Sequence, residues 1–141
     1  MKKLYFIFIF CFCSFVLPAQ ISSKNVEQFP VFRECDSLTS KSLETCFYNQ
    51  VQDFIFNNFK VPESLVQKNF KGSSIVLFEV DEQGKFNVLY VDAIDNELVE
   101  ESKRVFGLFP TVKPPTYAGK PTYAKYTIKI GIPLRSAAQI A

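Results

Sequence analysis

The strongest local pattern in the chain is a β-hairpin between residues 73 and 93. Two segments, Ser73 to Asp81 and Lys85 to Ala93, are rich in Val, Ile, Leu and aromatic residues, which favour strands. The short connection between them ends in Gly84, the residue type that a tight hairpin loop often requires. The first strand carries apolar residues on both faces, with Val76, Phe78 and Val80 on one and Ile75 and Leu77 on the other.

A third strand is predicted near the end of the chain, from Thr122 to Leu134. Its residues alternate in the way expected of a strand with one buried and one solvated face. The apolar face comprises Ala124, Tyr126, Ile128, Ile130 and Ile132, and the polar face comprises Tyr123, Lys125, Thr127 and Lys129. Pro133 cannot donate to a strand ladder, so it favours the end of this strand or a sheet edge.

Two amphipathic helices are predicted on either side of the hairpin. Apolar residues at helical spacing place the first from Ser42 to Phe59, and Pro62 marks the break after it. Asp95 or Asn96 can cap the second helix, whose first turns are acidic and which Gly107 ends. Four prolines between residues 109 and 121 predict an extended loop before the last strand. The expected order is helix, strand, strand, helix, strand, which is an α+β fold.

The first 19 residues have the pattern of a secretory signal peptide. Lys2 and Lys3 precede an uncharged, mostly apolar run from Leu4 to Leu17, and the small residue Ala19 follows. This run has 14 residues, fewer than the roughly 20 that cross a bilayer, so an uncleaved inner-membrane anchor is the alternative and not the prediction. We expect export to the periplasm and four regions: a signal peptide (1–19), a flexible lead-in (20–28), one domain (29–135) and a tail (136–141).

Two cysteines, Cys35 and Cys46, remain after removal of the signal peptide. An even pair in an exported domain is more often a disulfide than a metal site or a nucleophile. We therefore predict a Cys35–Cys46 bridge, which would tie the segment from Phe29 to Phe32 to the element that carries Cys46. The alternative is two free buried thiols, which requires a reducing compartment.

Several kinds of chemistry are disfavoured by the residues that the chain has. The 141 residues include no histidine, which removes the commonest general base and metal ligand, and the five glycines form no phosphate-binding loop. Loss of Lys2 and Lys3 leaves equal numbers of acidic and basic residues, so nucleic-acid binding loses its main driving force. We expect no enzymatic activity, no cofactor, no metal and no small-molecule substrate. Glu100 and Arg104, four residues apart, are predicted to form an ordinary surface ion pair.

The remaining candidate site is the last strand. If it lies at a sheet edge, its backbone can accept an extended peptide by strand addition. Lys125 and Lys129 would also discourage accidental pairing of this edge, which is an explanation that needs no ligand. Pairing of two copies through the same edge would give a homodimer.

The order and spacing of several short motifs resemble the C-terminal domain of TonB-type energy transducers, particularly the form found in Bacteroidetes. The resemblance extends from about Phe29 to Leu134. Its motifs are Phe29-Pro30-Val31-Phe32, Glu34-Cys35 with Cys46, Val61-Pro62, Leu65, Gly72, Phe78-Glu79-Val80-Asp81, Gly84-Lys85, Leu98 to Arg104, Phe109-Pro110, Pro114, Gly119-Lys120-Pro121 and Ile132-Pro133-Leu134.

The resemblance implies a three-stranded antiparallel sheet with two helices packed on one face. In that family the last strand binds the short TonB box of outer-membrane receptors during energised transport. Carried over to this chain, the peptide-binding strand would consist of Tyr123, Ala124, Lys125, Tyr126, Thr127, Ile128, Lys129 and Ile130. The lead-in from Gln20 to Gln28 spans at most about 30 Å and has no proline-rich spacer, so we expect a binding module and not a stand-alone transducer. The alternative is an exported structural or scaffold domain, stapled by the disulfide and not energised.

Overall fold

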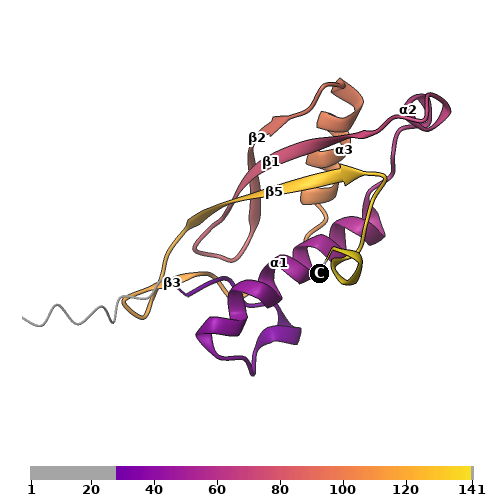
Figure 1. Ribbon diagram of the computed structural model, residues 1–141. Coiled ribbons are helices and arrows are strands. Elements are labelled where there is room, and N and C mark those ends of the chain that lie inside the picture. Colours follow the sequence, from indigo (N-terminus) through magenta and orange to yellow (C-terminus); the bar gives the residue numbers. More distant parts are fainter. Residues whose placement is uncertain (1–27, 141) are drawn as a thin grey trace, which may run out of the picture.

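The protein is an α+β domain built on a three-stranded antiparallel sheet, and the computed structural model describes residues 28–140 (Figure 1). The strands are β1 (Gly72–Val80), β2 (Phe86–Asp92) and β5 (Ala124–Ile132), arranged in the order β2-β1-β5. The main helices are α1 (Ser40–Asn58) and α3 (Asn96–Phe106). The predicted α+β class and order of these five elements are confirmed. The predicted signal peptide and most of the predicted lead-in lie outside the described residues.

Five shorter elements complete the chain. They are η1 (Arg33–Cys35), α2 (Glu63–Gln67), the two-residue strands β3 (Thr116–Tyr117) and β4 (Lys120–Pro121), and η2 (Ala137–Gln139). The loop predicted for residues 109–121 is therefore extended only in part, because its second half folds into the β3–β4 hairpin. Ala118 and Gly119 turn this hairpin with positive φ angles of 50° and 76°.

Helices α1 and α3 pack on the same face of the sheet. Phe78 of β1 is fully buried and its ring contacts Phe47 of α1 and Phe106 of α3, at centroid distances of 6.4 and 4.9 Å. In α1, buried Leu43, Phe47, Val51 and Ile55 recur every four residues, which places them on the stripe that faces the sheet. Aromatic rings dominate this core. The cluster extends to β5, where the ring centroid of Tyr126 lies 4.8 Å from that of Phe47.

Hydrogen bonds cap the start of α3 and link the helix to the sheet. The Asp95 carboxylate accepts the backbone N–H of Glu97 at 2.8 Å, which caps the helix as predicted. The buried hydroxyl oxygens of Ser74 in β1 and Ser102 in α3 lie 3.1 Å apart, and Ser102 donates to the Leu98 carbonyl at 2.7 Å. This polar contact adds a directional link between α3 and β1 within an otherwise apolar interface.

The turn between β1 and β2 contacts the proline-rich loop. Gly84 has a φ of +77°, and a Cβ atom added there would lie 1.8 Å from the carbonyl oxygen of Val112. The Val112 N–H donates to the Gly84 carbonyl at 3.0 Å, so the loop is hydrogen-bonded to the hairpin. Glycine is therefore required at this position both for its conformation and for close approach of the backbone.

Candidate functional site

The candidate site is the unpaired long side of β5, here called the β5 edge. All nine residues of β5 pair with β1 in continuous register, from Gly72 opposite Ile132 to Val80 opposite Ala124. Within residues 28–140, no strand pairs with the other side of β5. Alternate residues of an edge strand direct their N–H and C=O groups away from the sheet, where they can bind another backbone.

The predicted binding residues fall almost entirely within this strand. Ala124 to Ile130 belong to β5, which continues for two further residues to Ile132. Tyr123 precedes the strand and is 57% exposed. Residues of β5 alternate strictly between buried and exposed, as the sequence pattern predicts. The edge therefore presents a regular backbone whose register is held by the core.

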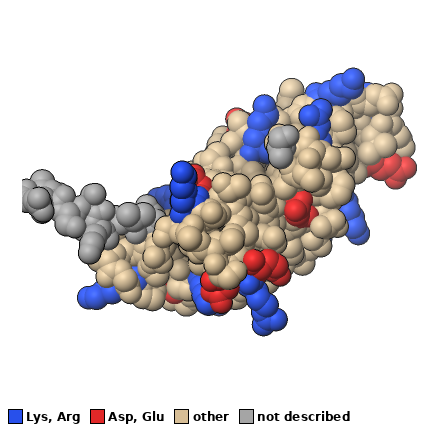
Figure 2. Space-filling model, turned by 60° about the horizontal axis from the view of Figure 1, so that its bottom comes forward, with Lys and Arg blue, Asp and Glu red and all other residues tan. Residues whose placement is uncertain are grey.

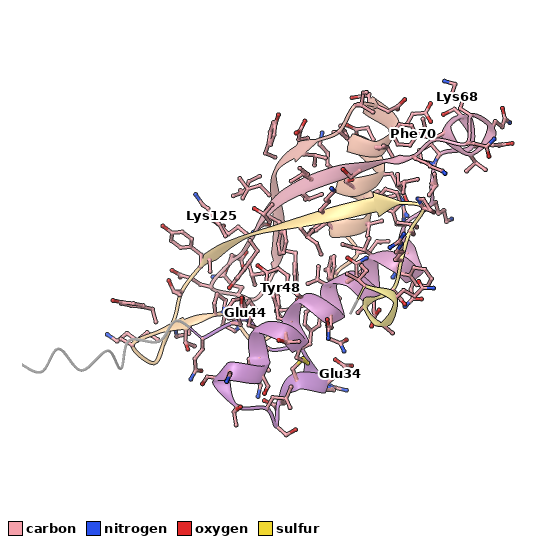
Figure 3. All side chains as sticks on the ribbon, viewed as in Figure 1. Glu34, Glu44, Tyr48, Lys68, Phe70 and Lys125 are labelled. Atoms are coloured by element: carbon pink, nitrogen blue, oxygen red, sulfur yellow. A yellow bond between two sulfur atoms is a disulfide. The ribbon has the colours of Figure 1, made fainter. Side chains whose placement is uncertain are left out.

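The solvent-facing side of β5 carries a small cationic surface. Lys125, Thr127 and Lys129 lie on the face opposite the helices, and Lys125 points away from α1 (Figure 3). The register places Lys125 opposite Glu79 and Lys129 opposite Ile75. Within the described part of the chain, neither lysine forms an ion pair. Both ammonium groups are thus available to a partner along the edge.

The helix-facing side of the same edge borders a groove, here called the α1–β5 groove. It has a volume of about 230 Å³ and is lined by Tyr48, Asn49, Gln52, Ile128, Ala137 and Ile140. Figure 3 shows Tyr48 between α1 and β5. Burial raises the pKa of Tyr48, and the Glu44 carboxylate raises it further.

Charge on the α1 side of the molecule is mixed. Figure 2 shows basic and acidic side chains interspersed around a broad uncharged area on the face it presents. A surface of this kind exerts no strong long-range attraction on a highly charged partner. This face therefore offers no charged patch of one sign to a partner.

A second apolar cavity lies beyond the end of β5, and no pattern in the sequence indicated it. Its volume is about 430 Å³. Its lining comes from the α1–β1 connection and from the end of the last strand: Val61, Leu65, Val66, Asn69, Phe70, Lys71, Ile132, Pro133 and Leu134. Because these segments are far apart in sequence, only the fold brings them together.

The predicted disulfide is confirmed and is structural. Cys35 and Cys46 are joined, with Cα atoms 6.1 Å apart, and Cys35 is 1% exposed. The bond connects η1 to α1. Neither sulfur is therefore available as a nucleophile or metal ligand.

Two carboxylates of α3 form ion pairs with basic side chains of the same helix. Arg104 binds Glu101 through two hydrogen bonds of 2.6 and 2.7 Å, and Glu100 pairs with Lys103, so the predicted Glu100–Arg104 pair is wrong. The guanidinium of Arg104 also donates to the Asn58 carbonyl, a contact that holds its side chain toward Glu101. No group of three potential metal-ligating side chains occurs among residues 28–140.

Comparison of the chain with protein-family models, with curated proteins and with solved structures finds no match. None of the helices between residues 28 and 140 has the length and apolar character needed to span a membrane. The functional proposal therefore relies on the geometry of the β5 edge and on the sequence resemblance.

Proposed function

We propose that the protein is an exported protein-binding module that adds an extended peptide to the β5 edge. The observation that carries this proposal is the nine-residue β5 strand, which is regular, firmly packed and paired on one side only within the described residues. Strand addition uses main-chain hydrogen bonds for affinity and alternate side chains for selectivity.

The core makes the β5 edge a rigid template. Tyr126 and Ile130 are buried among residues of α1 and β1, and Ile130 has no exposed surface. A strand held this way loses little conformational entropy when it binds a peptide, which favours association. The backbone of β5 therefore has its binding conformation before a partner arrives.

The sequence resemblance supplies a candidate partner. By analogy with the C-terminal domains of TonB-type transducers, the peptide would be the TonB box of an outer-membrane receptor, met in the periplasm after export. The module would then take part in TonB-dependent transport. Its two lysines, Lys125 and Lys129, would lie beside alternate side chains of that peptide.

The β5 edge disfavours one form of self-association. If two copies paired antiparallel with Thr127 at the centre, Lys125 of each copy would lie opposite Lys129 of the other. Like charges directly opposite each other destabilise a sheet. In a register centred on Ile128, by contrast, all nine residues of β5 would pair and Lys125 would lie opposite Gly131, so the lysines disfavour one register of a β5 homodimer and not every register.

The same lysines support a second candidate function, an exported scaffold domain whose edge remains unpaired. Lysines on an edge strand are a common means of preventing unwanted pairing. The disulfide would then serve stability alone. The two candidates differ in whether β5 binds a peptide.

A backbone NMR titration of the exported chain with TonB-box peptides from receptors of the same cell tests the proposal. We expect saturable shifts concentrated between Thr122 and Leu134. A peptide of the same composition in scrambled order is the control. A folded protein whose β5 resonances do not move with any of the peptides would leave the scaffold function as the better conclusion.

A further inference from the structure

The chain beyond β5 folds back toward the β5 edge. After Leu134 it descends toward α1, and η2 lies beside that helix (Figure 1). We call residues Arg135 to Ile140 the C-terminal segment. It starts where β5 ends, so it remains close to the strand that precedes it.

Two hydrogen bonds attach the C-terminal segment to α1. The Gln52 side-chain amide donates to the Arg135 carbonyl at 2.6 Å, and the Ala137 N–H donates to the Asp53 carboxylate at 2.8 Å. A third polar contact, from the Ser136 N–H to the Gln139 side chain, lies within the segment. The hydrogen bonds that attach the segment to the rest of the protein therefore go to two adjacent residues of α1.

The C-terminal segment buries little apolar surface against the rest of the protein. Ile140 is 59% exposed, and no residue from Arg135 to Ile140 is fully buried. Segments with few buried apolar contacts open at low free-energy cost. The C-terminal segment can therefore detach while the core remains folded.

The segment occupies space beside the β5 edge. Ala137 and Ile140 form one side of the α1–β5 groove, whose other side includes Ile128 of β5. Arg135 and Ile140 also line an adjoining cavity of about 530 Å³ together with Lys129 and Gly131. A strand added at roughly 4.8 Å from β5 would send its helix-facing side chains into the α1–β5 groove and its other side chains toward the cavity beside Lys129.

We propose that the C-terminal segment is a built-in competitor that partly covers the β5 edge and must detach from α1 before a peptide pairs along the whole strand. This inference rests on the proposed function, since it concerns access to the same edge. The groove released by detachment then receives the helix-facing side chains of the peptide.

Only the open form can pair with a peptide along the whole strand. The apparent affinity is therefore the intrinsic affinity multiplied by the fraction of molecules in which the segment is detached. Two hydrogen bonds of ordinary net strength give a closed-to-open ratio of about 30, so removing the segment should tighten peptide binding about 30-fold. The effect should be confined to peptides long enough to pass Ile128. A shorter peptide that pairs only with the first half of β5 should gain little.

Two variants test the inference by calorimetric titration of the exported chain with a synthetic TonB-box peptide. The first ends at Leu134, and the second, Asp53→Ala, removes only the acceptor for Ala137. Asp53→Asn retains an acceptor oxygen and should bind like the unaltered chain. Asn57→Ala, an exposed change on the same helix, is the matched control and should also have no effect.

A spectroscopic readout separates displacement of the segment from a general change in stability. Peptide binding to the unaltered chain should move the Ala137 amide resonance toward its position in Asp53→Ala. Sedimentation of the shortened chain checks that exposure of β5 has not produced a dimer that competes with the peptide.

The possible failures are distinct. Equal affinities for the unaltered and shortened chains, with no movement of the Ala137 resonance, would overturn the competitor role and leave peptide binding at β5 intact. Absence of binding to every folded variant would overturn the proposed function and this inference together. Weaker binding by the shortened chain would show that the segment supports the peptide instead of competing with it, and so would also overturn the inference.

Discussion

The two edges of the sheet differ in regularity. β5 pairs with β1 over nine residues without interruption, whereas β2 contains a bulge. Leu77 is opposite Tyr90 and Phe78 is opposite Val88, which leaves Leu89 as the extra residue. A bulge interrupts the ladder and increases local twist, so it makes an edge a poor template for another strand. The bulge thus disfavours pairing of another strand with β2, whereas β5 remains regular.

The edges also differ in how firmly the core holds them. Five of the nine residues of β5 are buried, whereas β2 has no buried residue and exposes Leu89 and Tyr90. The regular edge is therefore also the rigid one. A docking strand benefits from both properties, because its backbone groups must be aligned before the partner arrives.

The largest expected effect comes from shortening a buried side chain of β5. Ile130→Ala should lower the free energy of unfolding by about 2–5 kcal/mol, because it leaves a cavity beneath a side chain with no exposed surface. Leu89→Ala in the β2 bulge, where the side chain is 45% exposed, should change it by no more than about 0.5 kcal/mol. Urea denaturation of both variants measures the contrast. Equal losses would contradict the difference in packing between the edges.

Removal of the disulfide should have the next largest effect. Replacing Cys35 and Cys46 together by alanine should cost about 2–4 kcal/mol, because the unfolded chain regains the freedom of the closed loop. Since the bond joins η1 to α1 and lies outside the sheet, amide exchange should still rank β5 as more protected than β2. If β2 were instead more protected than β5, the regularity of β5 would depend on the disulfide.

Loss of the α3 cap should have a smaller effect that falls mainly on β2. Asp95→Ala removes the acceptor for the Glu97 N–H and should cost about 1 kcal/mol. Because α3 follows β2 in the chain and lies against it, amide protection should fall first in β2. Asp95→Asn, which keeps a capping oxygen, is the control. A uniform loss of protection across both edges would argue against this local coupling.

The smallest expected effect concerns Glu101 and depends on pH. Burial alone would raise the pKa of Glu101, but hydrogen bonds from Arg104 and from the Lys60 N–H lower it below its ordinary value. The stabilisation is therefore fully present above the ordinary carboxyl pKa and is lost as pH falls through the lowered one.

Glu101→Gln should accordingly cost less than about 1 kcal/mol at neutral pH and nothing once both forms are neutral in acid. Unfolding measured from neutral to acidic pH shows the convergence. Glu100→Gln, at a side chain that is 63% exposed, should cost less than Glu101→Gln at neutral pH. If Glu101→Gln and Glu100→Gln lower the free energy of unfolding equally, the hydrogen bonds of Glu101 stabilise the protein no more than the exposed Glu100–Lys103 pair does.

The elements that the sequence predicted well are those with long periodic patterns. Helix α1 was predicted from Ser42 to Phe59 and forms from Ser40 to Asn58, and the alternation of β5 was predicted residue by residue. Export and an even number of cysteines pointed to the disulfide that the structure contains. In each case the signal lies within a single segment or a single pair of residues.

The predictions that failed or were missing concern short elements and choices between neighbours. Helix α2 has five residues, too few to show a helical period, and Pro62 suggested only a break. Glu100 and Glu101 lie four and three residues before Arg104, and both spacings allow an ion pair on a helix. The Asn58 carbonyl, 46 residues away, holds the guanidinium on the side of Glu101.

The amphipathic patterns of this chain, its hairpin turn and its cap at Asp95 were determined by the sequence, because each depends on residues within one or two turns of one another. Tertiary structure alone decided that β5 lies at an edge, that β2 carries the bulge, and that the C-terminal segment returns to Gln52 and Asp53. These features depend on which distant segments pack together, and that choice is made by burial of the common core.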